Sequence, residues 1–497
     1  MGGVMWWKCL IVWVAGGAVA WAGGAEGEVS AEVAGDAEGT ARGAEVVAAT
    51  GATEPLLVGL EEGIAWALEG NRGLAVEAVG VERGAVGAER AWQGVAGWEV
   101  APVGGVREGD GTSRREAGVE AQWTGGWGTR LYGRTGVREW DFGDEEERVR
   151  RGEVRVGVEQ PLLKGFGRLV REEAGVAADE AWRAARRSLE RRRSALVVQV
   201  VECWEGARYQ ARQIDADIAQ ARRLEKLRAL ADVRERRGEV GRTEVLRLDW
   251  QLGEARQRVE DGRSALEVRL RELADLMGVG PERELVLGES PLLEVEVPEE
   301  SQAVAVAWRE RPEVAQAEEE LGAARRGVKI ARRGLLPDVS VVAEKAWWGD
   351  GESWNEATGG GDGEWVVGLE GRMPLRMADA RLEVSDRELA VRAAEGRLEL
   401  VKDSVALEVR SALAEWRRAR NSLRLARENR ARADERGELA RALFEAGRGA
   451  ADAVSDAESD MAAGVLGEAA AERDASVSAF RLLHALGRLV DTPEELL

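Results

Sequence analysis

The side chains that most often carry out catalysis are scarce in this sequence of 497 residues. His484 is the only histidine, and its apolar helical surroundings predict a packing role. Cys203 has only Cys9 as a second cysteine, in an apparent targeting segment, so we expect neither a disulfide nor a metal site. Gly165-Phe166-Gly167 lacks the βαβ context of a phosphate-binding loop, and there is no Ser/His/Asp set. The sequence therefore predicts neither an enzyme nor a cofactor.

The charge balance disfavours a further class of function, nucleic-acid binding. The formal net charge is −21, whereas nucleic-acid binding depends on a clustered positive surface, so we expect no nucleic-acid partner. Hydrophobic residues make up 44% of the chain and charged residues 32%. This composition is typical of a folded chain whose helices have solvated outer faces.

The first 53 residues are predicted to lie outside the folded part. Residues 1–22 are typical of a secretory signal peptide, with Lys8 ahead of an apolar stretch and Ala20 and Ala22 at an Ala-x-Ala cleavage site. An uncleaved anchor is the alternative, but the apolar run is short for a bilayer. Residues 23–53 have no apolar period and are predicted to be a flexible leader.

The elements of the folded part are organised around two changes from strand to long helix. Alternating residues lead into Pro161, and the helical pattern that follows meets no proline before Pro281. The same change recurs at Pro374, ahead of a helical pattern over residues 376–489. Alternation predicts strands at residues 119–123, 130–137, 153–158, 339–343 and 364–369.

Each change of pattern leads into a helical hairpin. In residues 165–277 the one interruption is 236–243, where two glycines and Thr243, a candidate N-cap, predict a turn. Two arms of about 55 residues would each be about 80 Å long. The second hairpin turns at residues 444–449. Shorter helices precede the strands, one starting at Pro55 and one over residues 304–334.

Matching glycines indicate that this pattern is duplicated. Three pairs lie at nearly one offset: Gly157 and Gly368 at 211 positions, Gly238 and Gly447 at 209, and Gly278 and Gly487 at 209. We therefore predict a first repeat at 54–280, a connector at 281–300, a second repeat at 301–490 and a tail at 491–497. The first repeat has the longer strand region, by one predicted hairpin.

The strands raise the question of a membrane. Beyond the signal peptide no 18 consecutive residues are apolar, which excludes a spanning helix but not a β-barrel. Aromatic residues near strand ends fit either a bilayer girdle or the core of a soluble sheet: Trp123, Trp127, Tyr132, Trp140, Trp347, Trp348 and Trp365. Four to six strands cannot close a barrel alone, and open edges are not tolerated in lipid, so a barrel would require an oligomer.

From about residue 55 to 489 the chain resembles the outer-membrane efflux (TolC-like) family of Gram-negative bacteria. The resemblance rests on the duplication and on the order of four features: Gln160-Pro161-Leu162-Leu163 with Gly165-Phe166-Gly167, Arg311-Pro312-Glu313-Val314, Gly334-Leu335-Leu336-Pro337, and the paired hairpin tips. It implies a mainly α fold with a β-barrel part. In that fold a homotrimer shares one barrel in outer-membrane lipid and one helical tunnel across the periplasm.

The function implied by the resemblance is that of a passive exit duct of a tripartite efflux or type I secretion system. An inner-membrane pump and a periplasmic adaptor (membrane fusion) protein would supply energy and substrate. A soluble periplasmic coiled-coil scaffold or adaptor protein is the alternative. It would explain the helices and the acidic charge, but would leave the strands and the changes of pattern at Pro161 and Pro374 without a purpose.

The resemblance also implies a periplasmic gate. Asp456, in Val454-Ser455-Asp456-Ala457, falls on the family's Leu-Asp-Ala position, and Asp452 lies one turn earlier. Three copies of each carboxylate around an axis would repel one another and favour cations. The alternative is that both are solvated acids on a helix face.

A latch between the hairpin tips is implied by the same resemblance. Thr243 and Glu244 stand on the first-repeat side, and Arg448 is placed to pair with Glu244. Phe444 replaces the expected tyrosine and cannot donate a hydrogen bond. Three tip residues match positions that contact an adaptor, and their alternative role is only to turn the chain: Gly238, Val240 and Gly447.

Overall fold

The computed structural model describes residues 56–109, 112–141, 148–238, 241–280, 282–288, 299–351, 362–373, 377–446 and 451–489. The predicted signal peptide, leader and tail lie outside this part of the chain. Two compact units alternate along the sequence: one combines residues 1–75, 192–298 and 411–497, and the other combines 76–191 and 299–410. We call them the helical unit and the sheet unit. Each predicted repeat contributes to both.

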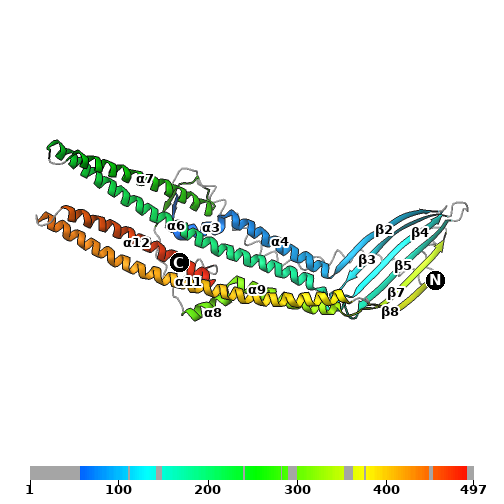
Figure 1. The fold of residues 1–497 in the computed structure, drawn as a ribbon. Coiled ribbons are helices and arrows are strands. Elements are labelled where there is room, and N and C mark those ends of the chain that lie inside the picture. Colours follow the sequence, from blue (N-terminus) through cyan, green and yellow to red (C-terminus); the bar gives the residue numbers. More distant parts are fainter. Residues whose placement is uncertain are drawn as a thin grey trace. The chain divides into compact units, whose positions relative to one another are not determined.

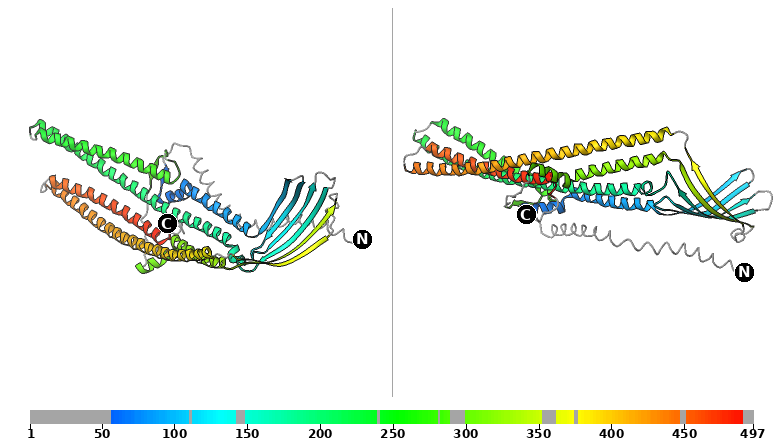
Figure 2. Two further views of the ribbon diagram at one scale, coloured as in Figure 1. Left: turned by 45° about the vertical axis from the view of Figure 1, so that its right-hand side comes forward. Right: turned by 90° about the horizontal axis from the view of Figure 1, so that it is seen from below.

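The sheet unit contains one antiparallel sheet of six strands, in the order β2-β3-β4-β5-β7-β8 (Figure 1). The strands are β2 (Gly97–Gly109), β3 (Thr112–Thr124), β4 (Arg130–Asp141), β5 (Arg148–Pro161), β7 (Asp338–Gly351) and β8 (Asp362–Arg372). Figure 2 shows them side by side as one curved sheet. The first repeat supplies four strands and the second supplies two, which confirms the longer strand region of the first repeat. The sequence prediction had left β2 without bounds of its own.

Helices lead into this sheet from both repeats. They are α4 (Arg72–Val95), the short α5 (Arg168–Arg171), α8 (Glu300–Glu310) and α9 (Pro312–Gly334). The prediction of one continuous helix over residues 304–334 is wrong, because the chain is extended at Arg311, with ψ 124°. A residue that precedes proline is disfavoured in the α conformation, so Pro312 ends one helix and begins the next.

Two short strands lie in the helical unit. β1 (Leu56–Val58) pairs in parallel with β6 (Leu285–Leu287), and α3 (Leu60–Gly70) follows β1. The prediction of a helix from Pro55 is therefore wrong at its start: the described chain begins as a strand, and the helix begins at Leu60. The predicted connector 281–300 likewise contains a strand, β6, that the sequence prediction missed.

The predicted helical hairpins are present, with turns where the glycines indicated. The first is formed by α6 (Glu173–Arg236, 64 residues) and α7 (Arg242–Leu276, 35 residues). The second is formed by α11 (Ala378–Glu445, 68 residues) and α12 (Ala451–Leu486, 36 residues). The prediction of equal arms of about 55 residues is wrong, because the turn lies far from the middle of each helical stretch. Both turns lie at the same end of the helical unit (Figures 1 and 2).

The core of the helical unit lies beside the β1–β6 pair. Trp204 is fully buried, and its indole Nε1 donates a hydrogen bond of 3.4 Å to the carbonyl of Val58. His484 lies 2.6 Å, Nδ1 to Oγ, from Ser194 and is half-buried, which agrees with the expected packing role. Cys203 is a free thiol, and the described residues hold no other cysteine. No helix in the described ranges is long and apolar enough to cross a membrane.

Candidate functional site

One face of the six-stranded sheet is mostly apolar, although the register also places Lys345 and the charged group Arg115, Glu139 and Arg150 on it. Side chains alternate along a strand and directly paired residues share a face, so the register fixes its members. They include Trp98, Val100, Val106, Val119, Trp123, Leu131, Val156, Val341, Trp347, Trp365, Val367 and Leu369. On the edge strand β8, Val367 is 74% exposed and Leu369 is 70% exposed. A largely apolar surface of this extent on a sheet is typical of one that meets lipid or another protein.

Tryptophans lie at two levels of this apolar face. Trp98 pairs with Trp123 at the ends of β2 and β3 nearest the helices. Farther along their strands, Trp347 and Trp365 flank Lys345, whose Nζ lies 5.4 Å and 4.7 Å from the two ring centroids. The strand-end aromatics named from the sequence do not all lie on this face. The register places three of them on the opposite face: Tyr132, Trp140 and Trp348.

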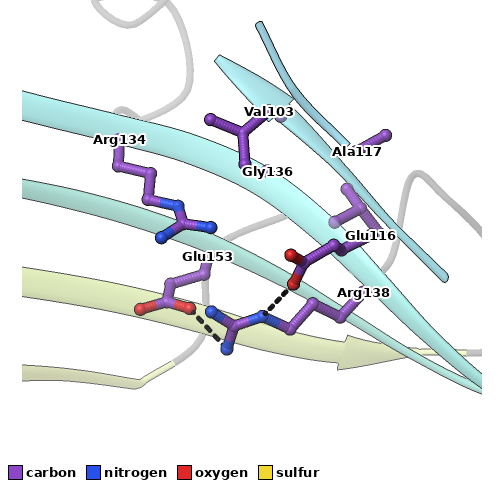
Figure 3. A pocket seen from close by; sticks show the side chains of 9 residues that line it. Val103, Glu116, Ala117, Arg134, Gly136, Arg138 and Glu153 are labelled. Atoms are coloured by element: carbon purple, nitrogen blue, oxygen red, sulfur yellow. Dashed lines mark ion pairs between the residues drawn. The ribbon is translucent and has the colours of Figure 1, made fainter. Parts of the chain in front are cut away.

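The opposite face of the sheet is charged, and its charges are linked across strands. Arg138 lies between two carboxylates, 3.6 Å from Glu116 and 3.0 Å from Glu153 (Figure 3). Arg155 continues the chain of ion pairs, at 2.5 Å from Glu153 and 3.3 Å from Glu344. Because the residues come from β3, β4, β5 and β7, the network ties four neighbouring strands together. Two further pairs extend it: Arg151–Asp350 at 2.6 Å and Arg130–Glu159 at 2.9 Å.

A small, shallow pocket of about 20 Å³ lies within this charged face (Figure 3). Gly118 and Gly136 are paired across β3 and β4 and form its floor. A Cβ at Gly118 would lie 2.5 Å from the carbonyl oxygen of Thr135, so a larger residue does not fit there. The guanidinium groups of Arg134 and Arg138 border the gap, which leaves a polar, water-accessible surface on this side of the sheet.

The predicted gate lies on α12. Asp456 is exposed, and no ion pair joins it to another described side chain. Its neighbours differ: Glu458 lies 3.8 Å from Arg223 of α6 and 3.7 Å from Arg441 of α11, and Asp460 pairs with Arg436. Among the described side chains, Asp456 is therefore a carboxylate without an ion pair, close in sequence to two acids that each have at least one. Asp452 lies in the first turn of α12, and its side chain is outside the described part.

The predicted latch is only partly described. Thr243 is exposed in the first turn of α7, and the prediction that it is the N-cap is wrong, because α7 begins at Arg242 with Gly241 as N-cap. Glu244 follows it in the helix, but its side chain is not among those described. Gly238 is exposed in the turn with φ 73°. Three predicted tip residues lie outside the described ranges: Val240, Gly447 and Arg448.

Comparison with known proteins finds one family model and several solved structures that resemble this chain. Residues 304–488 match the family model of the outer membrane efflux proteins. The match covers nearly all of the second repeat. The matched region holds β7, β8, α9, α11 and α12, and therefore both predicted gate residues.

Solved outer-membrane channels share the fold of nearly the whole chain. The outer-membrane channel OprN is 17% identical, with 86% of this chain and 89% of that chain covered and a TM-score of 0.64. VceC of Vibrio cholerae is 14% identical, with 86% and 96% covered and a TM-score of 0.63. CmeC of Campylobacter jejuni is 13% identical, with 88% of each chain covered and a TM-score of 0.65. No curated protein sequence matches.

Sequence reasoning missed the charged network of the sheet. Glu344 of β7 lies in the region that matches the family model, whereas Arg138, Glu153 and Arg155 belong to the first repeat. A signal was present in the sequence, because Arg130, Arg134 and Arg138 recur at every fourth residue of β4 and so share one face of the strand. Their partners depend on the register between strands, which alternation within one strand does not contain.

Proposed function

We propose that this chain is the outer-membrane exit duct of a tripartite efflux or type I secretion system, a passive conduit from the periplasm to the outside. Three copies share one barrel built from their six-stranded sheets and one tunnel built from their helical hairpins. A periplasmic adaptor and an inner-membrane pump supply substrate and energy. The match of residues 304–488 to the outer membrane efflux family and the fold of solved channels support this proposal.

The observation that carries the proposal is the two-faced sheet. An apolar face with tryptophans at two levels suits the lipid, because transmembrane strands carry aromatic residues at both interfaces. The charged face, with its linked arginines and carboxylates, suits a water-filled interior. Within the sheet the strand ladders satisfy the backbone groups, and only the outer edges of β2 and β8 need partners before the sheet can enter lipid.

The membrane location is tested by fractionation with a matched pair of variants. The wild-type protein should stay in the outer-membrane fraction after a urea wash and leave it only with detergent. Val367→Arg places a charge on the apolar face, where it costs about 2–4 kcal/mol near the bilayer midplane, and should lower the embedded fraction. Val366→Arg is the control, one residue away on the charged face. Equal behaviour of the two variants, or release of the wild type by urea, would contradict the proposal.

The periplasmic end of the tunnel carries the second part of the proposal. Asp456 and Asp452 ring the aperture, one turn apart on α12, and their charges favour cations. Replacing both by alanine should enlarge the conductance of the reconstituted channel or lower its preference for cations. Asp474→Ala is the control, because that carboxylate lies 2.7 Å from Arg473 on the same helix. Unchanged conductance and selectivity in the double variant would remove both residues from the gate.

A further inference from the structure

We propose that β2 of one copy pairs with β8 of the next copy in one defined register, with Glu99 opposite Arg372 and Arg107 opposite Glu364. Three copies joined in this way close a barrel of eighteen strands. The inference rests on the proposed function for the number of copies and for the membrane, and it adds the residues that join the copies and the size of the barrel.

The directions of the two edge strands permit this pairing. The six strands alternate in direction without exception, so the first, β2, and the last, β8, run antiparallel to each other. An even number of strands per copy keeps the alternation across every junction between copies. Both edges are long, 13 residues in β2 and 11 in β8, and neither has a partner within the described part of the chain.

Charged residues at the two edges differ from those inside the sheet. On the charged face of the inner strands, Arg138 and Arg155 are each paired with two carboxylates. At the edges, five exposed charged side chains on the same face form no ion pair with any described residue: Glu99, Arg107, Glu364, Glu370 and Arg372. A second copy would supply partners for four of them: Glu99, Arg107, Glu364 and Arg372.

The spacing of these four residues selects one register. On β2 the acid, Glu99, comes eight residues before the base, Arg107; on β8 the acid, Glu364, comes eight residues before the base, Arg372. In an antiparallel pair the positions on the two strands sum to a constant, so placing Glu99 opposite Arg372 also places Arg107 opposite Glu364. Opposite charges that face each other across strands are stabilising.

Alternative registers are disfavoured. A slip of one residue would turn the apolar face of one copy against the charged face of the next. A slip of two residues in one direction would place Arg107 opposite Asp362 but Glu99 opposite Glu370, and like charges that face each other are destabilising. That register has one attractive and one repulsive pair, whereas the proposed register has two attractive pairs. A slip of two in the other direction would leave Arg107 opposite Val366 and lose both ion pairs.

The neutral residues also fit the proposed register. Glycine stands opposite valine in four pairs: Val100–Gly371, Val103–Gly368, Gly104–Val367 and Gly105–Val366. Val106 stands opposite Trp365 on the apolar face. Pro102 stands opposite Leu369. Proline lacks an N–H group, so it removes at most one hydrogen bond from the junction, and it is tolerated in edge strands.

The register gives a barrel of ordinary geometry. Within one copy, the row of paired residues that starts at Gly97 ends at Gly368. In the proposed register Gly368 faces Val103 of the next copy. Val103 lies six residues farther along β2 than Gly97, where the row began, so the row shifts by six residues, its stagger, for every six strands. A barrel whose stagger equals its strand number has a strand tilt of about 36°. That value lies within the usual range of about 35–45°.

The size of the barrel follows from the unequal repeats. Two strands from each repeat would give twelve strands in three copies, and the additional hairpin of the first repeat gives eighteen. Because barrel diameter grows roughly in proportion to strand number, the lumen is about half as wide again. Barrels of about 16–18 strands leave an aqueous channel. The extra hairpin therefore sets the width of the exit.

Disulfide cross-linking between copies tests the register. In a Cys203→Ser background, Gly104→Cys with Val367→Cys should form cross-linked species up to the trimer on non-reducing gels. Gly104→Cys with Val366→Cys is the matched control, because the second cysteine lies on the other face of β8, and it should not cross-link. The proposal is overturned if embedded protein links equally through both pairs or only through the control. Loss from the urea-washed membrane fraction would overturn the proposed function instead, and the pairing with it.

Exchange of charges tests the same register without new covalent bonds. Glu99→Arg and Arg372→Glu should each shorten the lifetime of the trimer in detergent several-fold, and the two together should restore most of it. Glu99→Arg with Glu364→Arg joins residues that are not opposite each other, so its effects should add. Restoration in the control pair, or none in the proposed pair, would overturn the register even if the protein remains in the membrane.

Discussion

The two repeats close their second long helix in the same way. After α7, glycine with φ 72° follows the helix, and after α12, glycine with φ 77° does so. The hydrogen bonds match one for one: Gly278 N to Asp275 O and Val279 N to Ala274 O at 3.1 Å, and Gly487 N to His484 O at 3.0 Å and Arg488 N to Leu483 O at 3.1 Å. The six-residue bond from the second residue beyond the helix is that of a Schellman motif.

The repeats differ in their strands. Asn71 and Arg311 mark the equivalent helix breaks of the two repeats and lie 240 positions apart. Gly157 and Gly368 are the equivalent glycines in the last strand of each repeat and lie 211 positions apart. The first repeat therefore has 29 more residues between its helix break and its last strand, enough for one hairpin. Helix lengths are nearly equal, at 64 and 68 and at 35 and 36 residues. Insertion of a hairpin does not change the direction of the flanking strands, so a sheet accommodates two additional strands. The paired helices have kept nearly equal lengths.

The sharpest test of the matched helix ends is substitution of their glycines. Gly278→Ala should lower the free energy of unfolding by about 3 kcal/mol, because alanine is strained at positive φ. A Cβ there would also collide with the backbone of Gly70. Gly487→Ala should cost about 1–2 kcal/mol from the strain of positive φ. Thermal unfolding followed by circular dichroism in detergent measures both.

Gly80→Ala is the control for these substitutions. Gly80 lies inside α4, where nothing stands within 4 Å of the added Cβ. Alanine is favoured over glycine in a helix interior by about 0.5–1 kcal/mol, so this variant should be slightly more stable. Equal and small effects at Gly278 and Gly487 would show that the matched geometry carries little of the stability.

The two repeats also differ in the contacts that stabilise their helix breaks. Arg311 is buried and forms ion pairs of 3.1 Å with Glu313 and 2.9 Å with Glu408. Asn71 instead accepts a hydrogen bond of 3.1 Å from the backbone N–H of Leu74 and donates one of 2.9 Å to the carbonyl of Leu276. One break is held by charge, and the other by a neutral side chain that caps a helix.

Alanine at each break should therefore have a different cost. Arg311→Ala leaves Glu313 and Glu408 without this guanidinium and should cost about 2 kcal/mol, less than a fully buried pair because Glu408 is partly exposed. Asn71→Ala removes an N-cap and should cost about 1 kcal/mol. Asn71→Asp keeps the acceptor for Leu74 but loses the donor to Leu276, so it should fall between alanine and the wild type. Unfolding in urea gives the three values, and the reverse order would contradict this account.

The sequence predicted the features that depend on local patterns. Alternation placed β3, β4, β5, β7 and β8, and the glycines at Gly238 and Gly278 marked the turn and the end of the first hairpin. β1 and β6 were missed because strands of three residues are too short to show alternation. The break at Arg311 was missed because the apolar period continues through it, although Pro312 offered a signal.

In the candidate site, too, the sequence predicted what depends on local patterns and missed what depends on contacts between strands. Aromatic residues in the strands could be recognised, but whether Trp347 or Trp348 faces the apolar side depends on the register across strands. The same holds for the ion pairs of Arg138, whose partners come from β3 and β5. Asp456 was placed by resemblance alone, and the structure adds that it is exposed and without an ion pair to the side chains described around it. The gate itself stays a prediction.

The smallest expected effects concern two acids, one from each repeat: Glu205, which is buried, and Glu319, which is half-buried. Burial raises the pKa of Glu205, in α6, above its usual value, and Arg208 at 3.7 Å only partly offsets this. Burial also acts to raise the pKa of Glu319, in α9, but hydrogen bonds from Arg187 and Arg183 outweigh it and hold the pKa below its usual value. The two carboxyl groups should therefore make the pH dependence of stability differ in sign.

The sign follows from which protonation state each folded site prefers. The folded protein binds a proton at Glu205 more tightly than the unfolded chain does, so stability from this group rises as the pH falls from neutral towards the unfolded pKa of about 4.3. Glu319 contributes stability above that unfolded pKa and loses it as the pH falls through its lowered folded value.

Glutamine variants separate the two contributions. Glu205→Gln should raise stability by about 1 kcal/mol or less at pH 8, with the gain shrinking towards pH 5, because glutamine resembles the protonated acid that this buried position favours. Glu319→Gln should lower stability at both pH values and approach the wild type only below about pH 4. Denaturant midpoints at several pH values give the comparison. If the wild type and both variants change in parallel with pH, neither carboxyl group titrates with folding, and the repeats do not differ in the way these two acids are held.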